Sequence, residues 1–380
     1  MKVFGFLSHL DINLYLFRAP IIRVLILRGY KVYAICPKGD KNKALKELGC
    51  EVINYEIERK SLNPFRELKA IENIYYAIKD LDIDILHTFT AKPNIYGTFA
   101  AKRAKIPVIL NLVEGLGSFY TKDSFKYKTI RFIMESLYKR AFNLSNGVVF
   151  VNKDDPKYML EKGLISEKKI KIIKSVGIDT EKFSISHYSD EKLSNIKKSL
   201  GLENKIIVLM VARAIWDKGI KEFYEVAHML KKSHPNVVFV HVGGIDKGNP
   251  SSVSEEFLQN GSALWLNHRD DIVDLTAICD IYVLPSYKEG LPVTLLEAAS
   301  MSKPIITTNT TGCRDVVTDG LNGFLVPVKN IELLKEKIIL VLENKILRED
   351  MQKESRNKAV REFEVAKVVK QYMEYYETFF

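Results

Sequence analysis

One stretch of the C-terminal half, "PSYKEGLPVTLLEAASMSKPII" (residues 285–306), contains two glutamates eight residues apart. Carboxylates accept hydrogen bonds from both hydroxyls of a vicinal diol, so one glutamate can hold a sugar and the other a ribose. A proline in the first turn of a helix leaves the next N–H groups free, and the positive end of the helix then favours a phosphate. The candidates here are Glu289, Gly290, Leu291, Pro292, Val293 and Glu297. The same spacing also arises by chance, with Glu297 only capping a helix or forming a salt bridge.

Two cations lie five residues apart after an earlier apolar run, in "VARAIWDKG". Arg213 offers a planar fork to phosphate oxygens and Lys218 offers a compact charge, so together they can neutralise a departing diphosphate. The alternative is a pair of solvated loop cations. Gly243, in the "VGG" that ends the next apolar run, would let a ligand approach the backbone closely.

Further polar candidates follow the strands expected in the N-terminal half. They could meet the diphosphate or the sugar of an acceptor, although His9 is equally plausible as a structural histidine. His87 lies inside an expected strand, and we expect it in the core. The acceptor-side candidates at these strand ends are Ser8, His9, Arg18, Lys92 and Asn94.

Residues 122–140, "KDSFKYKTIRFIMESLYKR", interleave cations with large apolar side chains. A helix of this kind can lie in an anionic lipid interface with its cations on the headgroups. The alternative is an ordinary amphipathic helix that covers a domain core. The candidates for a membrane-facing surface are Lys122, Lys126, Lys128, Arg131 and Phe132.

The elements that must position these side chains alternate short β-branched runs with helical periodicity, as a doubly wound α/β sheet requires. The alternation pauses in a polar stretch near residues 187–198 and then restarts, which predicts two Rossmann-like domains. The strands are expected at residues 2–8, 31–36, 51–56, 84–89, 107–113, 147–152, 169–175, 205–212, 237–244, 263–267, 280–286, 304–309 and 323–327.

The first domain is expected over residues 1–185 and the second over residues 186–357, with a closing helix at 358–380 that packs back on the first domain. A chain of 380 residues is long for one core. Ligands of such sheets bind beyond the carboxyl ends of the strands, so the topology predicts a site between the two domains.

Composition and charge exclude several classes of protein. No run approaches the roughly 20 apolar residues of a spanning helix, and the four cysteines have no metal or disulfide spacing, so we expect a protein of the reducing cytoplasm that is not integral to a membrane. Residues 1–185 carry 32 Lys and Arg against 20 Asp and Glu. Nucleic-acid motifs are absent, so this excess favours an anionic membrane or a phosphorylated substrate.

The order of these motifs resembles that of the retaining nucleotide-sugar glycosyltransferases of family GT4, which have the GT-B fold of two Rossmann-like domains facing across a cleft. The resemblance covers essentially the whole chain. It implies that Glu297 binds the ribose, that Glu289 contacts the donor sugar, and that Arg213 and Lys218 hold the diphosphate. The segment "LNHRDDI" matches the part of the family near the nucleotide base, where His268 is as plausible structurally as functionally.

Stretches of the N-terminal half, among them "SHLDINLYLFRAPII", "RKSLNPF" and "LVEGLGSFY", resemble one bacterial branch of that family. Its members extend undecaprenyl-diphosphate-linked diacetylbacillosamine during protein N-glycosylation. The resemblance implies UDP-GalNAc as the donor substrate, an α1,3 linkage with retention, no cofactor or bound metal, and a peripheral position on the cytoplasmic face of the inner membrane. Transfer from UDP-Glc or UDP-GlcNAc to another lipid-linked sugar, a non-hydrolysing UDP-sugar epimerase and a degenerate sugar-nucleotide binding module remain alternatives.

One departure from the family concerns Glu114, in "LVEGLG", where many GT4 enzymes have a histidine. This glutamate could accept the proton of the acceptor hydroxyl or stabilise an oxocarbenium-like centre. It could also orient the acceptor, or be a buried structural residue. We therefore predict Glu114, Arg213, Lys218 and Glu289 as the catalytic group.

Overall fold

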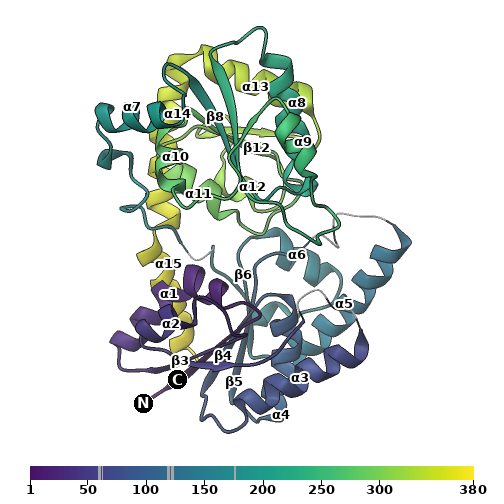
Figure 1. Ribbon diagram of the computed structural model, residues 1–380. Helices are drawn as coiled ribbons and strands as arrows, with labels where there is room; N and C mark the ends of the chain where they lie inside the picture. The colour runs from purple at the N-terminus through teal and green to yellow at the C-terminus, as the bar shows by residue number, and fades with distance from the viewer. Residues whose placement is uncertain (59–60, 62, 118–119, 121–123, 175–176) are drawn as a thin grey trace. The chain divides into compact units, whose positions relative to one another are not determined.

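The computed structural model describes residues 1–380 except 59–60, 62, 118–119, 121–123 and 175–176 (Figure 1). The chain divides into two compact units. Unit 1 comprises Met1–Val176 and Ala366–Phe380, and unit 2 comprises Gly177–Val365. These bounds differ from the expected ones, because residues 177–185 belong to unit 2 and only residues 366–380 of the closing segment belong to unit 1.

Unit 1 is built on a parallel sheet of seven strands in the order β3-β2-β1-β4-β5-β6-β7. Strands buried on both faces are expected to be nearly continuous apolar runs, and β1, β2 and β4–β6 are buried along almost their whole length. The strands are β1 (Val3–Ser8), β2 (Lys31–Cys36), β3 (Glu51–Asn54), β4 (Ile85–Phe89), β5 (Val108–Val113), β6 (Gly147–Phe150) and β7 (Ile170–Ile172).

Helices cover both faces of this sheet. On one face, Leu7 and Leu86 pack with Ile74 of α3, Ala100 of α4 and Phe142 of α5. On the other face α15 packs against the sheet, where the Tyr376 hydroxyl lies 2.7 Å from the His87 Nδ1. The helices are α1 (Asp11–Leu27), α2 (Asn42–Glu47), α3 (Pro64–Ile78), the π-helix η1 (Pro93–Gly97), α4 (Thr98–Arg103), α5 (Phe125–Leu144), α6 (Asp154–Glu161), η3 (Glu167–Lys169) and α15 (Val365–Glu377).

Unit 2 repeats this design with a parallel sheet of six strands in the order β10-β9-β8-β11-β12-β13. β8 and β11 lie side by side near its middle, so the loops that follow them are neighbours. The strands are β8 (Ile206–Val211), β9 (Val237–Val242), β10 (Leu264–Trp265), β11 (Ile281–Leu284), β12 (Ile305–Thr308) and β13 (Gly323–Val326).

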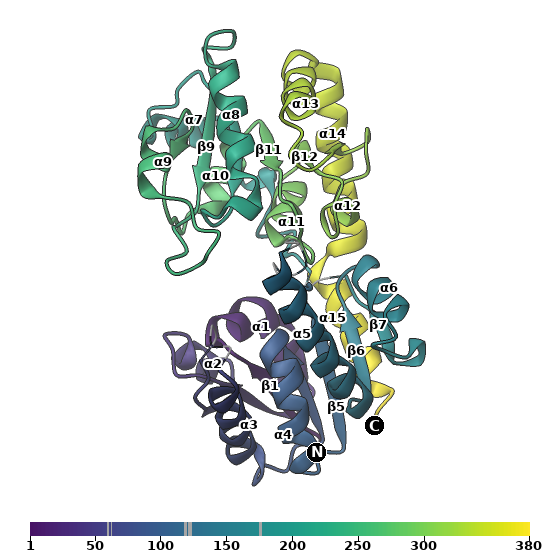
Figure 2. The same cartoon turned by 90° about the vertical axis from the view of Figure 1, so that its right-hand side faces the viewer.

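Among the helices of unit 2, α8 contacts α13, α10 contacts α7 and α11, and α14 contacts both α11 and α13 (Figure 2). They are η4 (Ile185–His187), α7 (Asp190–Ser199), η5 (Trp216–Lys218), α8 (Ile220–Leu230), α9 (Glu255–Asn260), α10 (Ile272–Ile278), α11 (Val293–Ser300), α12 (Cys313–Val316), α13 (Ile331–Glu343), α14 (Lys345–Lys358) and η6 (Ala359–Phe363).

Candidate functional site

Lys218 and Glu289 meet in unit 2 at the carboxyl ends of two neighbouring strands. Lys218 ends the turn after β8, and Glu289 lies in the loop after β11. The Lys218 Nζ lies 2.5 Å from the Glu289 Oε1, with the two side chains 20% and 11% exposed. The Ser286 hydroxyl donates to the same carboxylate oxygen at 2.5 Å. Because little water reaches this pair, the charge of Lys218 is weakly screened and would act strongly on an anion that took the place of Glu289.

Arg213 follows the same strand but turns to another carboxylate. Its Nη1 lies 2.6 Å from the Asp246 Oδ2, in the loop after β9, and the arginine side chain is 59% exposed. The two cations of the expected diphosphate clamp are therefore held by different loops. Each has an acidic partner that a diphosphate would have to replace or share.

The N-terminus of α11 lies directly after Glu289. Pro292 is the N-cap residue in an extended conformation. Within the described residues, no backbone acceptor is found for the N–H of Val293, so that group and the helix dipole remain available to an anion. Gly290 and Leu291 form the turn before the helix, and the Leu291 side chain is buried, so only its backbone can face a ligand.

Glu297 is half-buried in the second turn of α11. Burial raises the pKa of its carboxyl to about 7, although the positive charge of Lys182 opposes this shift. No hydrogen-bond partner of this carboxyl is found in the described part of the chain. A carboxyl of this kind can bind a hydroxyl pair, and such donors would favour its charged form.

Gly243 has surroundings that differ from the expected ones, and His268 lies on the surface. Gly243 has a φ of +154°, and an added Cβ would lie 1.8 Å from the Ala212 carbonyl oxygen. The close approach that requires this glycine is thus between two strand ends, not between backbone and ligand. The His268 side chain is 79% exposed, and its Nε2 lies 3.5 Å from the Asp270 Oδ1.

Arg18 and Glu114 form an enclosed charged pair in unit 1. Arg18, on α1, is fully buried and forms an ion pair through its Nη2 with the Glu114 Oε1, after β5. The guanidinium lies 4.5 Å from the centre of the Phe89 ring. The Glu114 side chain is 30% exposed, and its Oε2 accepts a hydrogen bond of 3.5 Å from Asn13. Glu114 can therefore still meet a ligand, whereas Arg18 acts on that ligand only through Glu114.

His9 and Ser8 lie at the end of β1 near this pair. The His9 Nδ1 is hydrogen-bonded to the Thr90 hydroxyl, after β4. The Ser8 side chain is fully buried, and its hydroxyl accepts a 3.4 Å hydrogen bond from the Leu10 N–H. The structure therefore gives Ser8 a structural position, and it does not support the expected contact with an acceptor.

Lys92 and Asn94 also have structural positions. The Lys92 ammonium donates to the Glu58 carbonyl at 2.7 Å and lies 2.7 Å from the Glu67 Oε1. Asn94 is fully buried, and its amide bridges Thr88 and the Leu112 carbonyl. The hydrogen-bonding groups of both side chains are occupied by the protein, so neither is placed to bind an acceptor.

The candidates for a membrane-facing surface lie on α5, apart from Lys122, which is outside the described residues. Lys126 and Lys128 are exposed, and Phe132 is 74% exposed. Arg131 instead turns inward, with its guanidinium 5.4 Å from the centre of the Tyr120 ring. No helix in the described part of the chain is long and apolar enough to cross a membrane.

Sequence reasoning missed the partners that hold the candidate side chains. Asp246, Ser286 and Asn13 each contact one of the predicted residues. Their positions after strands could have predicted these contacts, because polar residues that follow neighbouring strands of a parallel sheet meet at one edge of it. Among the described residues, no group of three or more His, Cys, Asp or Glu side chains is arranged to hold a metal ion.

Two family models match the chain. Residues 192–358 match glycosyl transferases group 1, and residues 6–152 match a model described as glycosyl transferase 4-like. The chain is 43% identical to the N,N'-diacetylbacillosaminyl-diphospho-undecaprenol alpha-1,3-N-acetylgalactosaminyltransferase of Campylobacter jejuni, over 98% of each chain.

More distant matches cover most of the chain as well. The chain is 28% identical to a UDP-Gal:alpha-D-GlcNAc-diphosphoundecaprenol alpha-1,3-galactosyltransferase of Escherichia coli, over 82% of this chain and 79% of the other. The crystal structure of Anabaena HepE in complex with UDP-glucose superposes with a TM-score of 0.80 at 18% identity, and the match covers 100% of both chains. This last likeness shows the fold alone.

Proposed function

Because the chain belongs to the group 1 family of glycosyltransferases and has the GT-B fold, we propose that it transfers N-acetylgalactosamine from UDP-GalNAc to undecaprenyl-diphosphate-linked diacetylbacillosamine. The product would carry an α1,3 linkage, formed with retention. This specificity rests on the 43% identity to the Campylobacter transferase, whose name states that reaction. The expected GT4 membership and glycosyltransferase activity are confirmed.

The observation that best supports donor binding by unit 2 is the Lys218–Glu289 pair beside the N-terminus of α11. The diphosphate of UDP-GalNAc would take Lys218 as a counter-charge and the helix N–H groups as donors, which leaves Glu289 free to accept from sugar hydroxyls. Arg213 would move from Asp246 to the same diphosphate. Positive charge at the leaving group lowers the barrier, because negative charge grows there as the glycosidic bond breaks.

Glu297 would bind the ribose diol, and Glu114 would orient the acceptor in unit 1. Arg18 already occupies one oxygen of Glu114, so the carboxylate has a fixed direction. A fixed carboxylate suits the positioning of an attacking hydroxyl. In a retaining transfer, that hydroxyl would attack from the face that the diphosphate leaves.

We further propose that the reaction needs no metal ion, since Arg213, Lys218 and the α11 N-terminus supply the positive charge that a divalent cation would otherwise provide. The test is transfer after exhaustive chelation with EDTA. Unchanged kcat is the expected result, and a loss that Mg²⁺ or Mn²⁺ restores would contradict it.

The test of function uses purified protein, radiolabelled UDP-GalNAc and the undecaprenyl-diphosphate-linked diacetylbacillosamine, with label counted in the organic phase. Transfer is expected from UDP-GalNAc and not from UDP-GlcNAc or UDP-Glc. Lys218→Ala is expected to lower kcat about 100-fold or more, as the loss of one such charge-stabilising group does. Lys221→Ala is the matched control, because that lysine is exposed on the next helix and pairs with Glu225.

Other outcomes separate the alternatives. Transfer from UDP-Glc or UDP-GlcNAc would support a glycosyltransferase but contradict UDP-GalNAc as its donor. Formation of a C2 epimer of the donor without lipid product would indicate an epimerase. UDP binding without turnover on any acceptor would indicate a binding module.

A further inference from the structure

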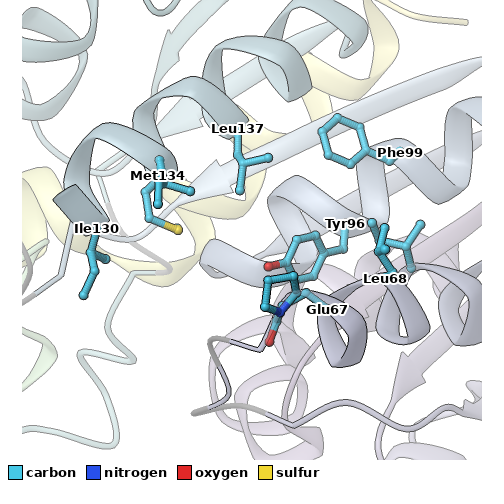
Figure 3. A pocket seen from close by; sticks show the side chains of 10 residues that line it. Glu67, Leu68, Tyr96, Phe99, Ile130, Met134 and Leu137 are labelled. Atoms are coloured by element: carbon cyan, nitrogen blue, oxygen red, sulfur yellow. The ribbon is translucent and has the colours of Figure 1, made fainter.

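An apolar pocket lies in unit 1 between α3, η1–α4 and α5, on the sheet face opposite α15. It has a volume of about 530 Å³, within the roughly 300–1,000 Å³ of pockets that hold small-molecule ligands. Figure 3 shows Leu68 of α3, Tyr96 and Phe99 of η1–α4, and Met134 and Leu137 of α5 around it. Of its ten lining residues only Glu67 is charged, and the Lys92 ammonium 2.7 Å away compensates that charge.

Apolar surface continues outward from this pocket. Leu68 is 61% exposed and Ile133, also in its lining, is 51% exposed, while Phe65, next to the lining residue Pro64 on α3, is 83% exposed. Large apolar side chains gathered at one place on a surface mark a binding site more often than scattered ones do. The pocket and its rim together would accept an elongated hydrocarbon.

A cation lies at the end of this surface that is nearest the strand termini. Lys126, Ile130, Ile133 and Leu137 follow one another at helical spacing, so they share a face of α5, with the lysine at its N-terminal end. That end lies toward the carboxyl edge of the sheet, because α5 follows β5. Lys126 has no ion-pair partner among the described residues, so its charge remains available to an anion.

We propose that this pocket binds the isoprenoid chain of the lipid acceptor, with Lys126 near its diphosphate. The inference rests on the proposed function and adds a binding site for the tail of that substrate. The surface has a cation at one end, Lys126, followed by the apolar side chains of Ile130, Ile133 and Leu137. This order matches a lipid with an anionic head followed by a hydrocarbon chain. The pocket holds only a segment of a polyprenyl chain, so it recognises the part of the tail next to the diphosphate.

The test compares acceptors that share the diacetylbacillosamine diphosphate and differ in the tail, which is undecaprenyl, farnesyl or methyl. The wild-type kcat/KM is expected to fall at least tenfold from the farnesyl to the methyl acceptor. Leu68→Trp and Ile133→Trp fill the pocket without making it polar, so they are expected to bring the ratio of kcat/KM for the farnesyl acceptor to kcat/KM for the methyl acceptor close to one. Their activity on the methyl acceptor and their KM for the donor should not change, which also establishes that the variants fold.

Ile346→Trp is the matched control, because this isoleucine is 74% exposed on α14 of unit 2 and outside the pocket. It should keep the wild-type ratio. If both pocket variants kept the wild-type ratio of kcat/KM between the farnesyl and methyl acceptors, the proposal would be overturned. If the same variants also bound lipid vesicles more weakly than the wild type, the pocket would be assigned to the acyl chains of the bilayer instead. Transfer to none of the acceptors would reject the proposed function itself.

A photoreactive farnesyl diphosphate supplies a readout that does not depend on turnover. Crosslinks are expected on peptides of α3 or α5, and unlabelled farnesyl diphosphate should compete with them. Crosslinks confined to unit 2, or labelling that Leu68→Trp and Ile133→Trp leave undiminished, would contradict the assignment.

Discussion

At the scale of single residues, Glu297 links donor binding to pH. Burial raises the pKa of this carboxyl to about 7 in the folded protein, from an ordinary value of 4.5. A raised pKa of an acid destabilises the folded state as the pH rises from about 4.5 through about 7, because only the unfolded chain then has the group fully charged. A buried carboxyl with a pKa shifted in this way is typical of a functional site, and this supports a role for Glu297 in ligand binding.

Glu297→Gln is therefore expected to separate stability from function. Above pH 7 the variant should unfold roughly 2–6 °C higher than the wild type, and the difference should vanish near pH 4.5. The KM for UDP-GalNAc should rise about 10–100-fold, because the charge-assisted bonds to the ribose are lost. Thermal scans at several pH values and donor titrations measure both effects, and an unchanged KM would remove Glu297 from the donor site.

The Arg18–Glu114 pair supplies a second residue-scale prediction. Glu114→Ala leaves a fully buried guanidinium without its counter-charge. We expect a loss of about 2 kcal/mol in the free energy of unfolding, less than the roughly 3–5 kcal/mol of a fully buried pair, since Glu114 is partly exposed. Glu72→Ala, which breaks the exposed pair with Arg103 in the same unit, should cost much less, because water screens that pair. Equal losses measured by denaturant unfolding would mean that Arg18 is satisfied without Glu114.

At the scale of elements, the turn between β8 and α8 fixes the position of Lys218. Gly219 has a φ of +76°, and an added Cβ would lie 2.2 Å from the Pro285 carbonyl oxygen. The Tyr287 N–H also donates to the Asp217 carbonyl at 2.9 Å, so the loops after β8 and β11 are joined by their backbones. This tight join places Lys218 against Glu289.

Gly219→Ala is expected to lower the thermal midpoint more than Gly201→Ala, although both glycines have positive φ. Gly201 has a φ of +66° and no atom within 4 Å of an added Cβ, so alanine there adds only about 1 kcal/mol of backbone strain. At position 219 the loops must also separate, and the KM for the donor should rise with the displacement of Lys218. Thermal scans and donor titrations of the two variants check this, and equal effects would show that the loops are not tightly joined.

The elements themselves could be predicted well from the sequence. Each of the 13 expected strands overlaps an observed one, because parallel strands buried on both faces are apolar along their length. The side-chain pairings could not be predicted, since they depend on which loops become neighbours. Lys92 and Asn94 follow a strand as a binding residue would, yet Lys92 pairs with Glu67 of α3 and Asn94 donates to the Leu112 carbonyl of β5. Sequence position indicated the right edge of the sheet without distinguishing side chains that face a ligand from those that hold the loops.

At the scale of the whole molecule, charge is divided unequally along the chain. Residues 1–185 contain 32 Lys and Arg but only 20 Asp and Glu, whereas the net charge of the whole chain is +10. We propose that this half associates with an anionic membrane surface, where the lipid-linked acceptor would be presented. Lys126 and Lys128 are exposed on α5 beside Phe125 and Phe132, which are 86% and 74% exposed. Cations next to exposed aromatic rings are typical of segments that lie in the headgroup region.

Charge reversal of the α5 lysines is therefore expected to weaken membrane binding. Each lysine near an anionic surface contributes about 1 kcal/mol, so the variant with Lys126→Glu and Lys128→Glu should partition at least tenfold less onto phosphatidylglycerol vesicles in sedimentation. The variant with Lys231→Glu and Lys232→Glu makes the same change in net charge after α8 of unit 2, and it should bind as the wild type does. Raising the salt from about 0.05 to 0.5 M should release the wild type, because the Debye length falls severalfold. If both variants lost binding equally, net charge alone would drive the association and α5 would have no special part in it.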